Sequence, residues 1–193
     1  PAPPGPPPPS LGYLSVIIPP KGLDRLVAAF LALAPTHGEL RLRVAGQVLN
    51  RRYWAGLKRQ IHRAGLASRL TFAGEVDAAD KRRFLQGCGL FCLPTRIPEA
   101  RGIAVMEALA AGVPVVVPPV GVFPELLERT GGGLLAGPGE LVETLERLLD
   151  DPAARARLGQ AGAAGVARHY SVRGMAQAML EQITHAVAGA ARA

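Results

Sequence analysis

The sequence predicts an α/β fold in which helices flank a sheet of parallel strands. Three features of its 193 residues indicate this fold. Short apolar runs rich in valine and leucine alternate with longer segments of helical periodicity. The apolar runs are nearly continuous, as expected for parallel strands that helices cover on both faces. Glycine or proline follows almost every run, so each strand has a defined end.

The first half of the chain contains three expected strands, at 11–18, 40–45 and 69–73, and three expected helices, at 22–34, 51–64 and 77–85. The strands end at Pro19, Gly46 and Gly74. Apolar residues recur every three or four positions in the first helix. The second helix is basic and amphipathic, and Asp77 is the expected cap of the third.

The second half contains expected strands at 90–93, 114–117 and 134–136, and expected helices at 103–111, 124–129, 140–149, 152–169 and 172–188. Pro94 and Pro118 end the first two strands, and Gly112 ends the first helix. Strands separated by helices of this length imply right-handed crossovers and therefore a Rossmann-like parallel sheet. In such sheets the ligand lies beyond the carboxyl ends of the strands, so the loops that follow them form the candidate site.

The first ten residues read PAPPGPPPPS, a stretch with few backbone donors that cannot join a sheet. Residues 1–10 are therefore interpreted as a proline-rich linker, with a disordered tail as the alternative. A linker at this position indicates a further domain upstream. Residues 11–193 are expected to form one domain, since their number suits a single hydrophobic core.

The net charge is +7, and basic groups occur at 51–52, 58–63 and 81–83. They are interpreted as solvated helix faces, with contact to a peripheral membrane surface as the alternative. A nucleic-acid partner is not expected, because the chain has neither an aromatic RNA-binding module nor zinc-ligand spacing. No apolar run reaches the roughly 20 residues that a membrane span needs. Cys88 and Cys92 are expected to be buried thiols, which favours a reducing, cytoplasmic setting.

The segment 98–117 carries the chemistry: an acidic loop, a glycine, the start of a helix and a strand. The first amides of a helix have no internal partner, and together with the helix dipole they form an anion site. Gly102 lets a phosphate or a sugar approach the backbone. Glu107 lies about one turn into the helix, where a carboxylate accepts hydrogen bonds from a ribose diol. Glu99 lies on the loop, close to the sugar that such a phosphate carries.

This segment resembles the Glu-x7-Glu signature of retaining glycosyltransferases with the GT-B fold, the glycosyl transferases group 1 type. Members typically read E-G-F-G, then a hydrophobic residue, then x-x-x-E-A-x-A-x-G-x-P-V-V. The matching positions are Glu99, Gly102, Glu107, Ala108, Ala110, Gly112, Pro114, Val115 and Val116. So many fixed positions are far more specific than a pair of glutamates.

Weaker features of the same family follow in the expected order. Residues 20–24 resemble the P-x-K-G-x-D segment, in which the lysine, here Lys21, contacts the donor diphosphate. Residues 72–76 resemble the F-x-G-x-V turn, which would bring Gly74 and Val76 beside the nucleotide base. Residues 121–125 and 132–135 resemble the G-G-x-P-E and G-x-L stretches. The resemblance thus covers nearly everything after residue 10.

The resemblance implies the C-terminal, donor-binding domain of a two-domain hexosyltransferase that uses a nucleotide-diphosphate sugar. Lys21 and the helix start at Gly102, Ile103 and Ala104 would hold the phosphates, Glu107 the ribose, and Glu99 the transferred sugar as the catalytic residue. The family pattern needs no metal and no cofactor. The N-terminal acceptor domain is absent from these residues, so this fragment is expected to be inactive alone.

Two departures from the family pattern leave alternatives open. Val16 stands where a phosphate-binding arginine is usual, and Ala100–Arg101 replaces Gly-Phe. Arg101 either supplies the missing charge or points to solvent. A degenerate, non-catalytic scaffold, a GT-B nucleotide-sugar epimerase and a basic nucleic-acid-binding domain remain as alternatives. The four histidines (His37, His62, His169 and His185) are expected at structural or surface positions without carboxylate partners.

Overall fold

A computed structural model describes residues 9–190 of the chain, apart from the side chains of residues 173, 175, 178 and 185–190. Most of the expected linker, residues 1–8, and the side chain of His185 therefore lie outside the described part. Six parallel strands form one sheet in the order β3-β2-β1-β4-β5-β6. The strands are β1 (Ser10–Leu14), β2 (Arg41–Ala45), β3 (Leu70–Phe72), β4 (Leu90–Cys92), β5 (Val115–Val117) and β6 (Gly133–Leu135).

Eight α-helices and two short 3-10 turns accompany these strands in the described residues. The α-helices are α1 (Leu23–Leu33), α2 (Arg51–Arg63), α3 (Ala78–Gln86), α4 (Ile103–Ala110), α5 (Phe123–Thr130), α6 (Leu141–Asp150), α7 (Pro152–His169) and α8 (Val172–Ala190). The 3-10 turns are η1 (Pro19–Lys21) and η2 (Ala67–Arg69). The α/β fold with a Rossmann-like parallel sheet and C-terminal helices is therefore confirmed.

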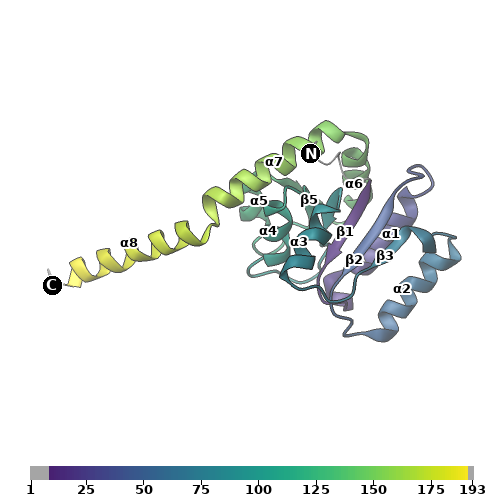
Figure 1. Ribbon diagram of the computed structural model, residues 1–193, viewed down its shortest axis with the longest axis horizontal. Helices are drawn as coiled ribbons and strands as arrows, with labels where there is room; N and C mark the ends of the chain where they lie inside the picture. Colours follow the sequence, from purple (N-terminus) through teal and green to yellow (C-terminus); the bar gives the residue numbers. More distant parts are fainter. Residues whose placement is uncertain (1–8, 191–193) are drawn as a thin grey trace.

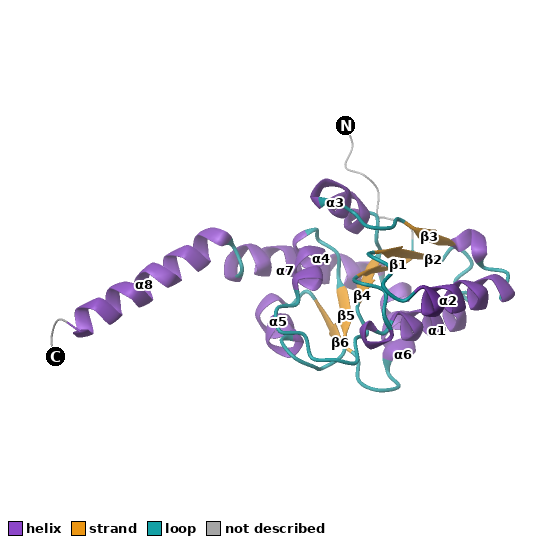
Figure 2. Cartoon of the chain, turned by 90° about the horizontal axis from the view of Figure 1, so that it is seen from below, coloured by secondary structure: helices purple, strands orange, loops and turns teal. Residues whose placement is uncertain are grey.

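The helices form two groups on opposite faces of the sheet (Figures 1 and 2). α1 contacts α2 and α6 on one face, whereas α4 contacts α3 and α7, and α7 contacts α5, on the other. Strand order runs outward from β1 to β3 in one direction and from β4 to β6 in the other. With right-handed crossovers this reversal forms a switch point between β1 and β4, where the loops that follow these strands diverge.

β1 is shorter than the strand expected at 11–18. The chain bends at Ser15, and Ile17 then forms an isolated parallel bridge with Val48. The bend leads into η1 and so brings the next residues over the carboxyl end of the sheet. Sequence hydrophobicity did not reveal it, because Ile17 is as buried as the strand residues before it.

The core lies on both faces of the sheet, with Tyr13, Phe30, Phe91 and Phe123 among its fully buried side chains. Cys88 and Cys92 are free and buried, as expected. Burial raises the pKa of the Cys88 thiol to about 11 and also raises the pKa of Cys92.

The expectation for one histidine was wrong. The ring nitrogen Nε2 of His37 lies 3.0 Å from the carboxylate oxygen Oδ1 of Asp150. The contact arises because α1 packs beside α6, and both residues lie at or just beyond the ends of these helices. It remains a pair at the protein surface, since most of the Asp150 side chain is exposed.

Candidate functional site

A cavity of about 260 Å³ lies at the carboxyl edge of the sheet, beside the switch point. Its walls come from the loop after β1, the loop after β4 and the first residues of α4. The lining residues are Ser15, Lys21, Leu93, Glu99, Ala100, Arg101, Gly102, Ile103 and Ala104. Five of the eight expected site residues therefore surround one cavity: Lys21, Glu99, Gly102, Ile103 and Ala104.

Lys21 reaches this cavity from the end of η1 and forms an ion pair with Glu99. Both side chains are about four-fifths buried, with exposed fractions of 17% and 20%. The next residue, Gly22, has a φ of +76° and lies so close to loop 94–97 that a Cβ atom would stand 2.0 Å from the carbonyl oxygen of Pro94. A side chain at this position would push η1, the turn that ends in Lys21 and is called the lysine turn below, away from the loop that carries Glu99.

A clamp of hydrogen bonds joins the lysine turn to the loop after β4. The backbone amide of Arg96 donates to the carbonyl of Pro20 at 2.8 Å, and its guanidinium Nη1 donates to the carbonyl of Pro19 at 2.7 Å. The Thr95 hydroxyl also donates to Pro20, at 3.2 Å. The same guanidinium binds both carboxylate oxygens of Asp24. Sequence reasoning missed this clamp, because its partners lie more than 70 residues apart.

The Asp24 carboxylate is the centre of this clamp. Burial alone would raise the pKa of Asp24, but hydrogen bonds from Arg96 and Tyr53 outweigh burial and hold that pKa below 3.8. The Tyr53 hydroxyl donates to Asp24 at 2.6 Å, and burial together with this bond raises the pKa of Tyr53. The bond to Asp24 likewise raises the pKa of Arg96. Asp24 therefore stays ionised and ties together the starts of α1, α2 and loop 94–97.

The loop that carries Glu99 is held from the other side by the start of α5. The backbone amide of Val122 donates to the carbonyl of Glu99 at 2.9 Å. A Cβ atom on Gly121 would stand 2.3 Å from that carbonyl oxygen, so only glycine permits the contact. No side chain in the described residues caps the N-terminus of α4. Its first amides therefore remain as donors toward the cavity.

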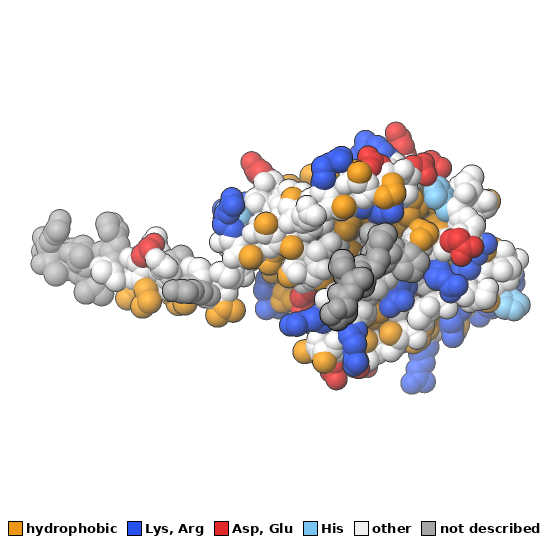
Figure 3. All heavy atoms as spheres, turned by 45° about the horizontal axis from the view of Figure 1, so that its top comes forward, with side chains coloured by type: hydrophobic (Ala, Val, Ile, Leu, Met, Phe, Trp, Pro, Cys, Tyr) orange, Lys and Arg blue, Asp and Glu red, His pale blue; other side chains and the backbone are white. Residues whose placement is uncertain are grey.

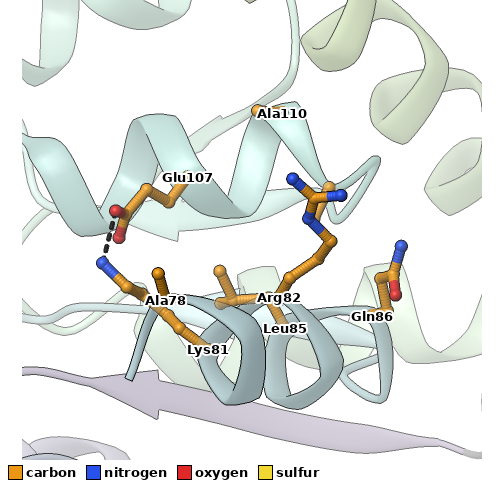
Figure 4. Close-up of a pocket in the computed structure, with 8 residues that line it drawn as sticks. Ala78, Lys81, Arg82, Leu85, Gln86, Glu107 and Ala110 are labelled. Carbon is orange, nitrogen blue, oxygen red and sulfur yellow. Dashed lines mark hydrogen bonds and ion pairs between the residues drawn. The ribbon is translucent and has the colours of Figure 1, made fainter. Parts of the chain in front are cut away.

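Glu107 lies one helical turn further along α4 and lines a second cavity, of about 370 Å³, between α3 and α4 (Figure 4). Its carboxylate oxygen Oε1 lies 2.5 Å from the Nζ atom of Lys81 on α3. Sequence reasoning did not identify Lys81 as a partner of Glu107. The only available signal was that their two helices flank the same strand, β4, in the chain.

Two expected site residues, Gly74 and Val76, line neither of these cavities. Gly74 and Val76 lie in the loop from β3 to α3, where the Gly74 carbonyl accepts a hydrogen bond of 2.7 Å from the amide of Gly46. Val16 is half-buried in the bend after β1. Arg101 is exposed and at the same time lines the cavity that contains Lys21 and Glu99.

Neither a metal site nor a membrane span is found among the described residues. No group of three or more His, Cys, Asp or Glu side chains in residues 9–190 has the arrangement of a metal site. None of the helices in that range combines the length and the apolar character needed to cross a bilayer.

The comparisons with known proteins agree on one family. The glycosyl transferases group 1 model matches residues 4–164. The lipopolysaccharide core biosynthesis mannosyltransferase LpsB of Rhizobium meliloti is 37% identical over 155 residues, which are 77% of this chain and 42% of that protein. A GDP-mannose-dependent phosphatidylinositol monomannoside mannosyltransferase of Corynebacterium glutamicum is 30% identical over 84% of this chain and 44% of its own length. The chain thus spans less than half of these two relatives.

Solved structures give the same result for the fold. HepE of Anabaena, solved with UDP and glucose, superposes with a TM-score of 0.81 at 26% identity, over 91% of this chain and 48% of that one. The C-terminal domain of the glycosyl transferase group 1 protein LpcC from Francisella tularensis superposes with a TM-score of 0.77 at 20% identity. That match covers 85% of this chain and 87% of the domain, so this fold has been solved as a separate unit.

Proposed function

Because the chain belongs to the glycosyl transferases group 1 family, we propose that it is the donor-binding half of a retaining glycosyltransferase. Such an enzyme transfers a hexose from a nucleotide-diphosphate sugar to an acceptor and needs no metal. The observation that carries the proposal is the meeting of Lys21, Glu99 and the start of α4 at one cavity beside the switch point. A lysine and bare helix amides suit a diphosphate, and a carboxylate beside them suits the hydroxyls of a sugar.

Each of the proposed site residues contacts one part of the donor. Lys21 and the amides of Gly102, Ile103 and Ala104 hold the diphosphate. Glu99 is the catalytic residue that contacts the transferred sugar, and its ion pair with Lys21 supports this arrangement because it keeps the two charges adjacent. Glu107 accepts hydrogen bonds from the ribose. The loop with Gly74 and Val76 lies beside the base.

Arg101 supplies a second positive charge for the diphosphate, in place of the arginine that Val16 replaces. What supports this role is its position directly before the helix start and on the wall of the cavity that contains Lys21. A guanidinium at a helix N-terminus adds a bidentate donor to the helix amides. The half-buried Val16 side chain has no donor to offer.

The decisive experiment is a titration of the chain with UDP and GDP, followed in amide NMR spectra. UDP and GDP are chosen because HepE was solved with UDP and the Corynebacterium relative is named GDP-mannose-dependent. One of them is expected to bind and to shift the amides of residues 102–104. Lys21→Met should weaken binding at least about ten-fold, since a hydrogen bond to a charged group contributes roughly 1.5–3 kcal/mol.

The matched control is Lys58→Met, which removes the same charge from the exposed face of α2. It should leave the affinity within about two-fold of the unmodified chain, because exposed charges at a distance are screened by salt. Equal losses of affinity in the two variants would mean that the Lys21 effect comes from the net charge alone, and would contradict the proposed site.

A catalytically inactive nucleotide-binding scaffold is the second candidate, favoured by Val16. The two candidates differ in what a donor sugar adds. In a donor domain, the affinity for UDP-glucose or GDP-mannose is expected to differ from the affinity for UDP or GDP, and Glu99→Gln should remove that difference. A scaffold that contacts only the nucleotide would bind both forms with equal affinity, with or without this substitution.

A GT-B epimerase is a further alternative. It would release an altered sugar, which a product assay on the longer protein detects.

The rest of the enzyme is proposed to be an N-terminal acceptor domain, joined by the proline-rich residues that precede β1; the expected linker 1–10 is thereby shortened, because Ser10 is buried in that strand. This proposal is supported by the relatives, of which the chain covers 42% and 44%. Catalysis needs both reactants in a closed cleft that excludes water. The chain alone should therefore hydrolyse UDP-glucose or GDP-mannose at no more than the background rate, and robust hydrolysis would contradict the two-domain proposal.

Contact with an anionic membrane surface is proposed for α2. Its exposed positions other than Gln60 carry basic side chains, whereas Trp54, Leu57 and Ile61 pack into the core. The exposed basic residues are Arg51, Arg52, Lys58, Arg59 and Arg63, with His62. Each such charge contributes about 1 kcal/mol near an anionic bilayer. Sedimentation with phosphatidylserine vesicles, but not with phosphatidylcholine vesicles, would support a cytoplasmic enzyme peripheral to the membrane; equal sedimentation with both would contradict it.

A further inference from the structure

The ion pair between Lys81 and Glu107 differs from the other lysine or arginine pairs on the same face of the fold. It joins two helices, α3 and α4, and the two side chains are only 29% and 34% exposed. The pairs Arg83–Asp80 and Arg129–Glu125 each lie within one helix and are more than half exposed. A pair that is two-thirds buried and fixed at both ends by helix backbone restricts the carboxylate far more than a pair in solvent.

The geometry leaves one carboxylate oxygen available. Lys81 Nζ donates to Oε1 of Glu107 at 2.5 Å, and Oε2 has no hydrogen-bond partner among the described residues. Figure 4 shows the lysine rising from α3 to meet the glutamate at one end of the groove between the helices. Because Lys81 binds Oε1, Oε2 is the carboxylate oxygen that is left to accept a hydrogen bond from a ligand in this cavity.

We propose that Lys81 is a positioning residue, which holds the carboxylate of Glu107 so that Oε2 accepts a hydrogen bond from a ribose hydroxyl of the donor nucleotide. This inference rests on the role proposed above for Glu107. Lys81 does not contact the reacting atoms: it fixes the rotamer of the glutamate before the nucleotide binds, so the nucleotide does not have to order it. The consequence is a preference for ribonucleotides over 2′-deoxyribonucleotides that depends on Lys81.

The test compares UDP and GDP with 2′-deoxy-UDP and 2′-deoxy-GDP by amide NMR titration of the 193-residue chain. The unmodified chain should bind the ribonucleotide more tightly, and Glu107→Gln should lose that preference. Lys81→Met should weaken binding of the ribonucleotide about five-fold and leave the deoxyribonucleotide nearly unchanged, an effect within the range of couplings between contacting residues. Lys81→Arg should restore most of the preference, because it restores a cation at the same place.

Arg82 provides the matched control. It neighbours Lys81 on α3 and lines the same cavity, but it is exposed and makes no ion pair within the described residues. In Figure 4 its guanidinium extends toward the other end of the groove, away from Glu107. Arg82→Met removes the same charge and should change the affinity for ribo- and deoxyribonucleotides by equal factors.

The outcomes separate the inference from the function on which it rests. If Glu107→Gln abolishes the ribose preference and Lys81→Met does not, the donor site stands and the positioning role of Lys81 is wrong. Tighter binding of the ribonucleotide by Lys81→Met would also overturn that role, since it would mean that the lysine competes with the nucleotide. If neither nucleotide binds the unmodified chain, the proposed function fails and the inference fails with it. The amide spectrum of each variant establishes that it is folded.

Discussion

Gly22 is the residue on which the geometry of the lysine turn depends most directly. It combines a φ of +76° with a backbone carbonyl 2.0 Å from where a Cβ atom would be. The first feature costs roughly 1–2 kcal/mol for any other residue. The second adds a clash with backbone that a side-chain rotation does not relieve.

Gly22→Ala is therefore expected to lower the free energy of unfolding by about 2–5 kcal/mol, as the sum of backbone strain and the clash. Urea unfolding measures this change. Gly65→Ala is the control, because Gly65 has a nearly equal φ of +73° and no heavy atom lies within 4 Å of the point where its Cβ atom would stand. Gly65→Ala should lower the free energy of unfolding by only about 1–2 kcal/mol. Equal losses would mean that the loop after β4 moves away at little cost.

The Asp24–Arg96–Tyr53 clamp acts between elements, since it joins α1, α2 and loop 94–97. The pKa of Asp24 is lower in the folded chain than its ordinary value of 3.8. The folded state therefore binds a proton less readily than the unfolded state. The stabilisation is complete well above pH 4 and is lost as the pH falls from about 4 through the lowered pKa.

Asp24→Asn is expected to cost about 1 kcal/mol at pH 7, a modest value because both partners are 36% exposed. The difference from the unmodified chain should shrink below pH 4. Urea unfolding at pH 7, 5, 4 and 3 tests both statements. Asp80→Asn, which removes an exposed pair within α3, should change stability by less than about 0.5 kcal/mol. A deficit of Asp24→Asn that stays constant down to pH 3 would exclude the ionised clamp.

Helix α7 packs against α4 and α5 along a line of three glycines spaced three residues apart. They are Gly159, Gly162 and Gly165, and all three are buried. A Cβ atom on Gly159 would stand 2.2 Å from the carbonyl oxygen of Gly112, at the end of α4. The glycines therefore weaken α7 as an isolated helix but allow it to approach the helix that carries Glu107.

Replacing glycine with alanine should have opposite effects on stability in helices α7 and α2. Gly159→Ala is expected to destabilise the chain by about 1–3 kcal/mol, because the clash exceeds the gain in helix propensity. Gly56→Ala on α2 has no heavy atom within 4 Å of the added Cβ and should stabilise by about 0.5–1 kcal/mol. Thermal unfolding of both variants gives the signs. A stabilising Gly159→Ala would mean that α7 is not held closely against α4.

At the scale of the whole molecule, the sequence predicted the order and type of every helix and strand that the structure describes, apart from the two short 3-10 turns. It succeeded because Gly or Pro ends most elements and because apolar runs and helical periodicity alternate regularly. It could not predict how Lys81 meets Glu107, or how Arg96 meets Asp24. Those pairs depend on strand order and on crossovers that place distant segments side by side, which no local pattern records.

The resemblance to a family identified the candidate site more sharply than local patterns did. It singled out Lys21 and Glu99 as residues of one site although 78 positions separate them, and the structure pairs them. The bend after Leu14 and the contact of His37 with Asp150 were missed for the opposite reason. They depend on three-dimensional packing at positions that the matched family motifs do not include.

Helix α8 extends away from the body of the molecule (Figures 1 and 2) and packs on it mainly through α7. Figure 3 shows hydrophobic side chains along the projecting helix. Val172, Met179, Leu180 and Ile183 are 79%, 65%, 64% and 54% exposed. Three of them, Val172, Met179 and Ile183, lie seven and four residues apart and so share one face. A stripe of exposed apolar side chains is typical of a surface that contacts another protein surface.

We therefore expect the chain alone to self-associate at high concentration through α8, and a triple Met179→Gln, Leu180→Gln, Ile183→Gln variant to remain monomeric. The variant should unfold at the same temperature as the unmodified monomer, because these side chains bury little surface within it. Analytical ultracentrifugation and thermal unfolding measure the two effects. Leu148→Ala is the contrasting control, since Leu148 is 2% exposed and its truncation should cost about 2–5 kcal/mol. If the triple variant lost several degrees of thermal stability instead, α8 would have to fold back onto the body in solution, and the stripe would belong to the core of this domain rather than to a contact surface.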